Sequence, residues 1–430
     1  MAEYKGLAYL KNKLAMRKYR VIERYKYYEM KNYVFDFGIS TPPELRWLMG
    51  ALGWCGKAVD SLADRLVFRD FKNDVYNFTT IFNDNNKDVL TDSAINAALI
   101  GSCSFIYITT DETGYPRLRV IDGRHATGII DPITNMLKEG YAVLEFDDCD
   151  NPLIEAYFIP GLTAIYEGGK LTSAIRNDAP YPLLVPIINR PDAVRPFGHS
   201  RISRACMSIM DSAVRTVKRS EIAAEFFSYP QKYVLGMEDS AEEMDKWQAT
   251  MSAMLRIDKD SQGDRPVVGQ FQATSMTPHA DILRMFAGLF AGETGLTLDD
   301  LGFPSQNPSS AEAIKSSHET LRLTARKAQR DIGTGLLNAG YLASCVRDKR
   351  PYRRQELSEV VPKWEPIFEP DNTALTVMGD AIAKINSAVP GYIDRDTLYE
   401  LTGIEGADTL STGGVVTAEA IDRALGITEE

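Results

Sequence analysis

Cysteine is scarce in this 430-residue chain. There are five cysteines, an odd number, far apart in the sequence and without a C-x-x-C pair: Cys55, Cys103, Cys149, Cys206 and Cys345. This pattern does not favour a disulfide framework, a redox motif or a zinc finger, and we expect the chain to be made in a reducing cytoplasm.

Long apolar runs are missing as well. No stretch approaches the roughly 20 uninterrupted apolar residues that a membrane helix needs, so we expect no membrane partner. The segment from Lys5 to Lys31 is basic and rich in tyrosine, and it has no short apolar core followed by a cleavage site. A signal peptide is therefore not expected.

The sequence lacks the familiar motifs of catalysis. Gly53-Trp-Cys-Gly-Lys57 has neither the spacing of a phosphate-binding loop nor the Ser or Thr that follows its lysine, and G-x-S-x-G, H-E-x-x-H and a G-x-G-x-x-G after a strand do not occur. The four histidines have no second His or Cys at metal-ligand spacing: His125, His199, His279 and His318. We therefore expect no enzyme, no cofactor and no metal site.

Positive charge is in deficit, with 48 Lys and Arg against 59 Asp and Glu and a net charge of -11. This balance argues against phosphate neutralisation as the main task of the protein. It is compatible with a channel along which DNA slides without being held. The segment from Met1 to Lys31 contains nine Lys and Arg but only three Asp and Glu. The segment after Arg354 contains fifteen Asp and Glu but only four Lys and Arg. The two ends face different surroundings, or they form two solvated faces of opposite sign.

The first 190 residues predict helices followed by a mostly antiparallel sheet, an α+β class. Helices are expected over residues 1–31, Glu44–Leu66 and Thr91–Ile100, the last capped by Thr91 or Asp92. Strands are expected over 105–108, 117–121, 140–146 and 155–159, with a hairpin over 162–175 around Gly168-Gly169.

A Pro-punctuated segment, residues 186–200, is expected to lead into a helix from Ser200 to Ser228, on the order of 40 Å long. A narrow stripe on this helix suits close packing of long helices: Ile202, Cys206, Ile209, Ala213 and Val217. Arg215 and Lys218 lie on the same helix and complete the candidates for packing against another copy of the chain. A small α/β unit is expected next, with strands over 231–236 and 265–271 and a helix over 241–255, before a second long helix over 276–294.

The loop 295–310 precedes another long helix, for which Ser309 and Glu312 form a capping box. This helix is expected to run to about Gly340, with an apolar face of Ile314, Leu321, Ala325, Ala328 and Ile332 and a basic face of Lys315, Arg322, Arg326 and Arg330. The basic face could contact phosphates. We favour pairing of these residues with acidic residues of an adjacent subunit, because no aromatic side chain that could stack on a nucleotide base lies among these Lys and Arg residues. Three short helices are expected over 371–430.

The order of these elements and three motifs resemble the portal proteins of tailed phages of the siphophage type, over essentially the whole chain. The motifs are Asn189-Arg-Pro…Phe197-Gly-His-Ser-Arg-Ile-Ser203, then Glu293-Thr-Gly-Leu…Leu301-Gly…Asn307-Pro-Ser-Ser-Ala-Glu-Ala-Ile314, and Val120-Ile-Asp-Gly…Ile130-Asp-Pro132. The second is the most specific. The chain departs from the pattern at Thr297, where many relatives have a proline, which leaves the backbone path of the loop open.

The resemblance implies a portal fold with an α/β wing, two tunnel-lining stem helices, a small α/β clip insertion, a long wing helix and a helical C-terminal crown. Its parts are the wing (1–199), stem helix 1 (200–228), the clip (229–275), stem helix 2 (276–294), the tunnel loop (295–310), the long wing helix (311–345) and the crown (346–430). The loop residues implied to approach DNA are Ser305, Gln306, Asn307 and Ser309.

The function implied is that of a ring, usually of twelve copies, at one capsid vertex of the virion, through which double-stranded DNA is packaged and ejected. The partners implied are the large terminase subunit, a head-tail connector or adaptor protein, and the major capsid and scaffold proteins. Three alternatives stay open: another non-enzymatic head-assembly or adaptor protein, an enzyme with a site of scattered polar residues, and a DNA-binding regulator.

Overall fold

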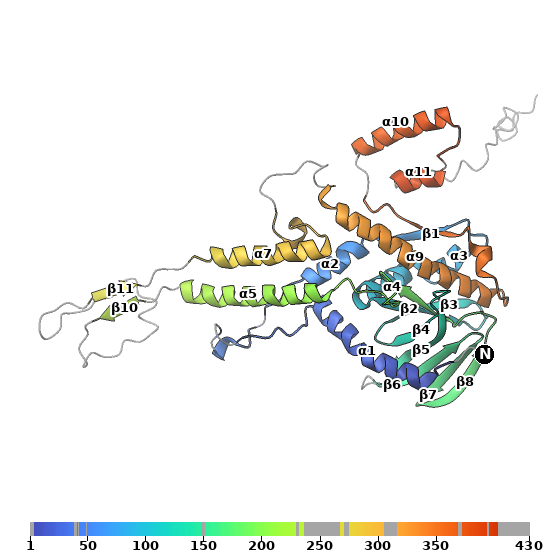
Figure 1. Ribbon diagram of the computed structural model, residues 1–430, viewed down its shortest axis with the longest axis horizontal. Coiled ribbons are helices and arrows are strands. Elements are labelled where there is room, and N and C mark those ends of the chain that lie inside the picture. The colour runs from blue at the N-terminus through green and yellow to red at the C-terminus, as the bar shows by residue number, and fades with distance from the viewer. Residues whose placement is uncertain are drawn as a thin grey trace, which may run out of the picture.

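The computed structural model describes residues 4–37, 41, 43–48, 50–147, 151–228, 232–235, 267–270, 275–304, 316–368, 372–393 and 395–402. The fold is a mixture of helices and sheets. A body of packed helices and sheets carries two long helices that lie side by side and project from one side, with a pair of antiparallel strands at their far end (Figure 1). The predicted α+β class is therefore confirmed.

The N-terminal part of the body is mainly helical. Its elements are α1 (Leu7–Tyr28), η1 (Pro43–Leu45), α2 (Trp54–Ala63), β1 (Phe68–Lys72), α3 (Phe78–Asn83) and α4 (Lys87–Gly101). The helix predicted over Glu44–Leu66 is wrong in its first half, where only the short turn η1 forms and α2 begins after Gly53. Two glycines, Gly50 and Gly53, lie between the two elements and disfavour a continuous helix.

Helix α4 begins four residues before the predicted start. Asn86 is its N-cap residue, in the left-handed region, so the proposed caps Thr91 and Asp92 are wrong. Thr91 lies one turn inside the helix, and its hydroxyl donates to the carbonyl of Lys87 at 2.9 Å. A Thr within a helix often bonds back to the preceding turn in this way, which sequence alone does not distinguish from capping.

Two antiparallel sheets follow, where the sequence predicted one mostly antiparallel sheet. Strands β2 (Cys103–Thr110), β3 (Pro116–Asp122) and β9 (Leu184–Ile188) pair in the order β3-β2-β9. Strands β4 (Ala126–Ile130), β5 (Leu137–Phe146), β6 (Pro152–Ile159), β7 (Leu162–Glu167) and β8 (Lys170–Arg176) form a meander in chain order. The hairpin at Gly168-Gly169 is confirmed, because Glu167 pairs with Lys170 across it.

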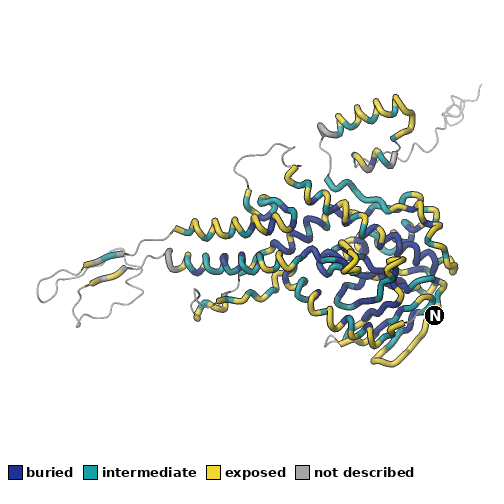
Figure 2. The backbone as a smooth tube through the Cα atoms, viewed as in Figure 1, coloured by how far each residue is buried: buried dark blue, intermediate teal, exposed yellow. Residues whose placement is uncertain are grey.

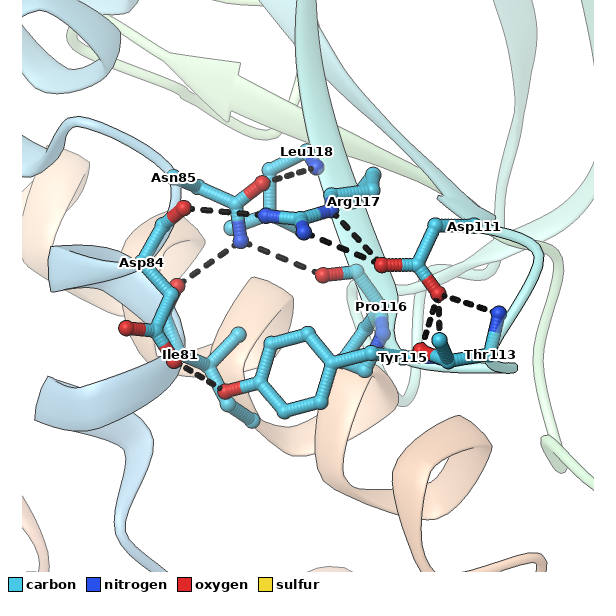
Figure 3. Close-up of polar contacts among 9 residues, drawn as sticks. All are labelled: Ile81, Asp84, Asn85, Asp111, Thr113, Tyr115, Pro116, Arg117 and Leu118. Carbon is cyan, nitrogen blue, oxygen red and sulfur yellow. Dashed lines mark hydrogen bonds and ion pairs between the residues drawn. The ribbon is translucent and has the colours of Figure 1, made fainter.

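The turn between β2 and β3 is tied to the loop between α3 and α4 (Figure 3). Asp111 accepts hydrogen bonds from the hydroxyl of Thr113 at 2.6 Å and from the amide of Tyr115 at 3.0 Å. These bonds, led by that of Thr113, lower the pKa of Asp111 to about 2. The hydroxyl of Tyr115 donates to Asp84 at 2.7 Å, and Asn85 donates to the carbonyl of Pro116. The hairpin is thereby fixed against the helical layer.

The C-terminal part returns to the body through α9 (Glu319–Arg347), a long helix that crosses it. Leu321, Ala325, Ala328 and Ile332 are buried, as predicted, while Ile314 lies outside the described residues. The helix runs to Arg347 rather than to Gly340. Its second half is buried on almost every side, mainly against β9, so the burial continues past the amphipathic stretch (Figure 2).

The remaining elements complete the body and the projection. They are α5 (Arg204–Ser228), β10 (Lys232–Leu235), β11 (Val267–Gln270), α7 (Thr277–Thr294), η2 (Asp299–Leu301), η3 (Arg354–Leu357), β12 (Val361–Trp364), α10 (Asn372–Ala388) and α11 (Arg395–Thr402). Strands β10 and β11 pair antiparallel and β12 pairs with β1. The helix predicted over 241–255 and the last C-terminal helix lie outside the described residues. Within the described part of the chain, no helix is long and apolar enough to cross a membrane.

Candidate functional site

Buried polar contacts and two glycines of positive φ occur at the junction between the body and the two projecting helices. It comprises residues 189–203 and 294–302, which enter α5 and leave α7, respectively. We refer to it as the junction, and to α5 with α7 as the helix pair.

The entry into α5 depends on a turn that only glycine can make. Gly198 has φ +71°, and a Cβ atom built on it would lie 2.1 Å from the carbonyl oxygen of Asn189. That carbonyl accepts the amide of His199 at 2.8 Å, and the side-chain amide of Asn189 donates to the carbonyl of His199 at 2.7 Å. The loop between them is closed further by His199 Nε2, 2.6 Å from Asp192 Oδ2, a contact that lowers the pKa of Asp192. The turn therefore fixes the direction in which α5 starts.

The next two residues, Ser200 and Arg201, donate hydrogen bonds to backbone carbonyls at the end of α4. The hydroxyl of Ser200 donates to the carbonyl of Ile100 at 2.6 Å, and the amide of Arg201 donates to the carbonyl of Leu99 at 2.8 Å. These are carbonyls of the last turn of α4, which lack partners inside the helix. The helix predicted from Ser200 begins instead at Arg204, because residues 200–203 are used for these contacts.

Arg201 is a buried cation, only 9% exposed. Its guanidinium donates to the carbonyl of Ala58 in α2, at 3.2 Å, and to the carbonyl of Thr294, the last residue of α7. Burial lowers its pKa to about 10. Since no described carboxylate forms an ion pair with it, the carbonyls at the negative end of α7 stabilise its charge. Arg201 therefore connects α2 with the end of α7.

Ser203 links the two helices of the pair. Its hydroxyl oxygen accepts the amide of Cys206 at 3.1 Å at the start of α5, and its hydroxyl donates to Glu293 of α7 at 2.8 Å. On leaving α7, Gly295 has φ +71°, and a Cβ there would lie 2.8 Å from the side chain of Thr320. Thr297 then donates from both its amide and its hydroxyl to Asp300, so the chain turns without the proline of many relatives.

The predicted stripe on α5 is only partly the buried face. Ile202, Cys206 and Ala213 are buried, whereas Ile209 and Val217 are half-buried. Met210 and Val214 are buried as well, and the sequence reading missed them. The signal was present, since Met210 and Val214 lie four apart and continue the row of Cys206 on the helix surface.

Arg215 and Lys218 lie under residues 31–37 and 43–48, which we call the strap. Lys218 pairs with Asp36 at 2.9 Å and donates to the carbonyl of Arg46 at 3.1 Å. The guanidinium of Arg215 lies 5.0 Å from the ring centroid of Phe37. Both cations are thus engaged within the chain and hold the strap along α5.

The strap and α7 both expose apolar side chains. On the strap, Tyr33 is 77% and Trp47 74% exposed, and Phe35 and Phe37 are also exposed. On α7, an exposed row is formed by Ile282, Met285 and Leu289, while Leu283 and Phe286 are half-buried and Phe290 is buried. Large exposed aromatic and aliphatic groups in contiguous rows are typical of protein interaction surfaces.

The predicted tunnel-loop residues, Ser305, Gln306, Asn307 and Ser309, lie outside the described residues, as does Lys315. The basic face of α9 is therefore described only for Arg322, Arg326 and Arg330. Arg322 pairs with Glu319 of its own helix at 2.6 Å, which lowers the pKa of Glu319. Arg326 and Arg330 are exposed.

Arg322 and Arg326 also line a groove of about 470 Å³ between α9 and the β12 region, together with Trp364 and Phe368. Across the described ranges, no group of three or more His, Cys, Asp or Glu could hold a metal ion. The pairing with an adjacent subunit expected for the basic face stays a prediction for Arg326 and Arg330.

Comparison with known proteins gives a consistent result. The family model described as phage portal protein, SPP1 Gp6-like, matches residues 7–377. The portal protein of Mycobacterium phage L5 is 23% identical over 400 residues, covering 86% of this chain and 79% of that protein. The portal protein of Mycobacterium phage D29 is 22% identical over 408 residues, with the same two coverages.

Two solved structures of gene transfer agent (GTA) particles are similar in part. A chain in the neck of the empty particle, computed with C6 symmetry, has a TM-score of 0.48 and 16% identity and covers 86% of this chain and 96% of its own. A chain in the neck of the native particle, computed with C12 symmetry, has a TM-score of 0.44 and 15% identity and covers 82% and 90%, respectively.

Proposed function

This chain belongs to the SPP1 Gp6-like family of phage portal proteins, and from this premise we propose that its copies close into a ring at one capsid vertex. The helix pair α5–α7 would surround a central passage through which double-stranded DNA enters and leaves. The subunit would be a component of the virion.

The parts of the chain are assigned accordingly. Residues 1–199 and 311–345 form the wing, 200–228 and 276–294 the two stem helices, 229–275 the clip, 295–310 the tunnel loop and 346–430 the crown. The strand pair β10–β11 lies at the far end of the helix pair, where a clip would be reached from outside the capsid (Figure 1). We propose that it binds the large terminase subunit during packaging and the connector or adaptor protein later. The wing and crown would contact the scaffold and major capsid proteins.

The main support for a ring is the placement of two exposed apolar surfaces, one on α7 and one on the strap. Asp211, Arg215 and Lys218 lie on one face of α5, and this face contacts the strap or the end of α1. Cys206 and Ala213 lie on the opposite face by helical spacing. Figure 1 shows α7 on one side of α5 and the segment that joins α1 to α2 on the other. The apolar rows of α7 and of the strap therefore belong to elements that α5 separates.

Two different apolar surfaces on opposite sides of one subunit cannot cover each other within that subunit. A strap that packs against the α7 row of the next copy makes a heterologous, head-to-tail contact, and such contacts close into rings when the rotation allows it. Tyr33, Phe35 and Trp47 would then meet Ile282, Met285 and Leu289 of the neighbour. Gly288 and Gly292 of α7 have open space beside them, which leaves room for aromatic rings.

The charge of the chain suits a passage for DNA. A net charge of -11 avoids strong capture of phosphates along the wall, so that DNA can slide. The energy for translocation would come from the terminase, a separate protein.

The experiment that tests the proposal is the mass and appearance of the purified full chain at micromolar concentration. Twelve copies of the 47.9 kDa chain would have a mass of about 575 kDa, and end-on images should show a ring with a central hole. A compact monomer or dimer that does not assemble even when its scaffold protein is added would contradict the proposal.

A further inference from the structure

A cavity of about 460 Å³ lies between α1, the start of β2, the strand β4 and the loop that precedes α5. Five cationic side chains line it: Lys13, Arg17, Arg20, Arg24 and Arg195. The first four follow one another at intervals of four, three and four residues on α1, so they share one face of that helix. This face belongs to neither the strap nor the helix pair.

The cations of this cavity have no anionic partner in the described chain. None of the five forms an ion pair with a described Asp or Glu, and the inner two bind backbone carbonyls instead. Lys13 Nζ donates to the carbonyl of Gly128 and lies 4.8 Å from the ring centroid of Phe197. Arg24 donates to the carbonyl of Gly101 at 3.2 Å. Glu139, a buried carboxylate that raises the pKa of Lys13 slightly, accepts hydrogen bonds from the amides of Lys5 and Gly6.

This arrangement stores electrostatic repulsion. Like charges four residues apart on a helix destabilise it, by a few tenths of a kcal/mol per pair in isolated helices. Here burial adds to the effect: burial first, and the neighbouring Arg17 second, lower the pKa of Lys13 to about 8. Burial also lowers the pKa of Arg24. An anion placed in the cavity would relieve both the repulsion and the desolvation.

The cavity is only half polar, and its apolar part indicates the kind of anion. Leu14, Val21 and Phe105 in its lining are buried, and we call these three side chains its floor; Ile129, Ile130 and Phe197 are among its other apolar residues. The strand β4 is the edge strand of its sheet, because it pairs with β5 alone. An edge strand can pair with an extended peptide through its remaining backbone donors and acceptors, although the carbonyl of Gly128 in β4 already accepts a hydrogen bond from Lys13.

We propose that this cavity binds an acidic segment of a partner protein, in which carboxylates alternate with apolar side chains. The carboxylates would pair with the arginines of α1, whose planar groups match a carboxylate with two hydrogen bonds. The apolar side chains would pack on the floor, and the segment would run along β4. Duplex DNA fits less well, because a volume of about 460 Å³ admits a few side chains and not a double helix, and an apolar floor adds nothing to phosphate binding.

The test is binding of labelled peptides to the purified full chain. The probe is a fluorescein-labelled eight-residue peptide of alternating Glu and Val, and the comparison peptide has Gln in place of Glu. We expect the Glu peptide to bind at least tenfold more tightly than the Gln peptide, with an affinity that falls as salt rises. Equal binding of the two peptides, or no binding of the Glu peptide, would overturn the proposal.

Variants locate the site. Arg17→Gln with Arg20→Gln removes two exposed cations from the cavity, and we expect at least a tenfold loss of affinity for the Glu peptide. Lys18→Gln with Lys26→Gln removes the same charge from the same helix outside the lining, and we expect a change of less than twofold. Equal losses in the two double variants would show non-specific attraction to a basic helix and would overturn the proposal.

A second readout does not depend on variants. Lys13, with its lowered pKa, should be acetylated readily by a low concentration of acetic anhydride at pH 8 and be protected when the Glu peptide is bound. Mass spectrometry of the peptide that contains Lys13 measures this, with the exposed Lys26 as the internal reference. Unchanged labelling of Lys13 at saturating peptide would contradict the site. A 12-nucleotide single strand that protects Lys13 more strongly than the peptide would identify nucleic acid as the ligand and overturn the proposal.

Discussion

Gly198 offers the sharpest test of how the junction is built. The residue combines a left-handed backbone with a contact that leaves no room for a side chain, since its Cβ would lie 2.1 Å from the carbonyl oxygen of Asn189. Gly114, in the turn between β2 and β3, has a similar φ of +83° but nothing within 4 Å of its Cβ position. The two glycines therefore differ in the clash and not in the backbone.

The magnitude follows from these two terms. A left-handed conformation costs an alanine about 1–2 kcal/mol at either position. At Gly198 the methyl group must also displace Asn189, which breaks the two hydrogen bonds between Asn189 and His199, at about 1 kcal/mol each. We expect Gly198→Ala to lower the free energy of unfolding by about 3–4 kcal/mol and Gly114→Ala by about 1–2 kcal/mol.

The assay is urea unfolding of the full chain followed by intrinsic fluorescence, with the two variants measured beside the parent protein. Hydrogen exchange of the amides of residues 199–206 adds local information, because the loss of the turn should expose the start of α5 first. If Gly198→Ala is no more destabilising than Gly114→Ala, the contact with Asn189 does not hold the entry to α5, and the reasoning fails.

Three further perturbations are expected to act as follows. Trp47→Ser should abolish the ring at micromolar concentration in mass photometry without lowering the stability of the monomer, whereas Ile133→Ser, at a residue 88% exposed away from the strap, should leave the ring intact. Arg201→Met should lower the free energy of unfolding by about 2 kcal/mol in urea titration, because two buried carbonyls lose their donor while the loss of a desolvated charge offsets part of the cost. Asp111→Asn should remove a part of the acid dependence of stability: the pKa of Asp111 is lowered from 3.8 to about 2 by folding, so its contribution is fully present above pH 4 and is lost as the pH falls towards 2.

Each of these expectations has an outcome that would contradict it. Rings that persist with Trp47→Ser would refute the contact of the strap with a neighbour and leave the family assignment untouched. An unchanged unfolding midpoint in Arg201→Met would show that the end of α7 is held by other contacts. Parallel stability curves for Asp111→Asn and the parent protein between pH 4 and pH 2 would show that the turn is not formed around this carboxylate.

The local elements and their order followed from the sequence. Runs of β-favouring residues between turn signals predicted strands within β2, β3, β5 and β6 and the Gly168-Gly169 hairpin, whose tight turn needs a positive φ. The strand β4, with which the meander begins, was not predicted. Small and apolar residues at helical spacing predicted α5, α7 and α9. The motif around Gly198 and that around Gly295 also indicated the family, and the structure shows a physical reason for both glycines, since each has a positive φ and no space for a Cβ.

The ends of the helices and the partners of single residues depended on tertiary contacts. The predicted helix over 44–66 gave way to the strap because the side chains of α5 bind the backbone and side chains of that segment, as Lys218 does with Asp36 and Arg46. Helical periodicity predicted that Cys206 and Ala213 lie on one face. The elements that pack against α5 decide that Met210 is buried and Ile209 only half-buried.

The role of Arg201 and the basic cavity could not be read from the sequence at all. Arg201 binds residues 143 and 93 positions away, and the cavity joins α1 to Arg195, more than 170 positions along the chain. A sequence shows which groups are present and how they repeat along one element. Only folding decides which distant groups share a low-dielectric space, and there a cation without a carboxylate takes carbonyls as partners or remains available for a ligand.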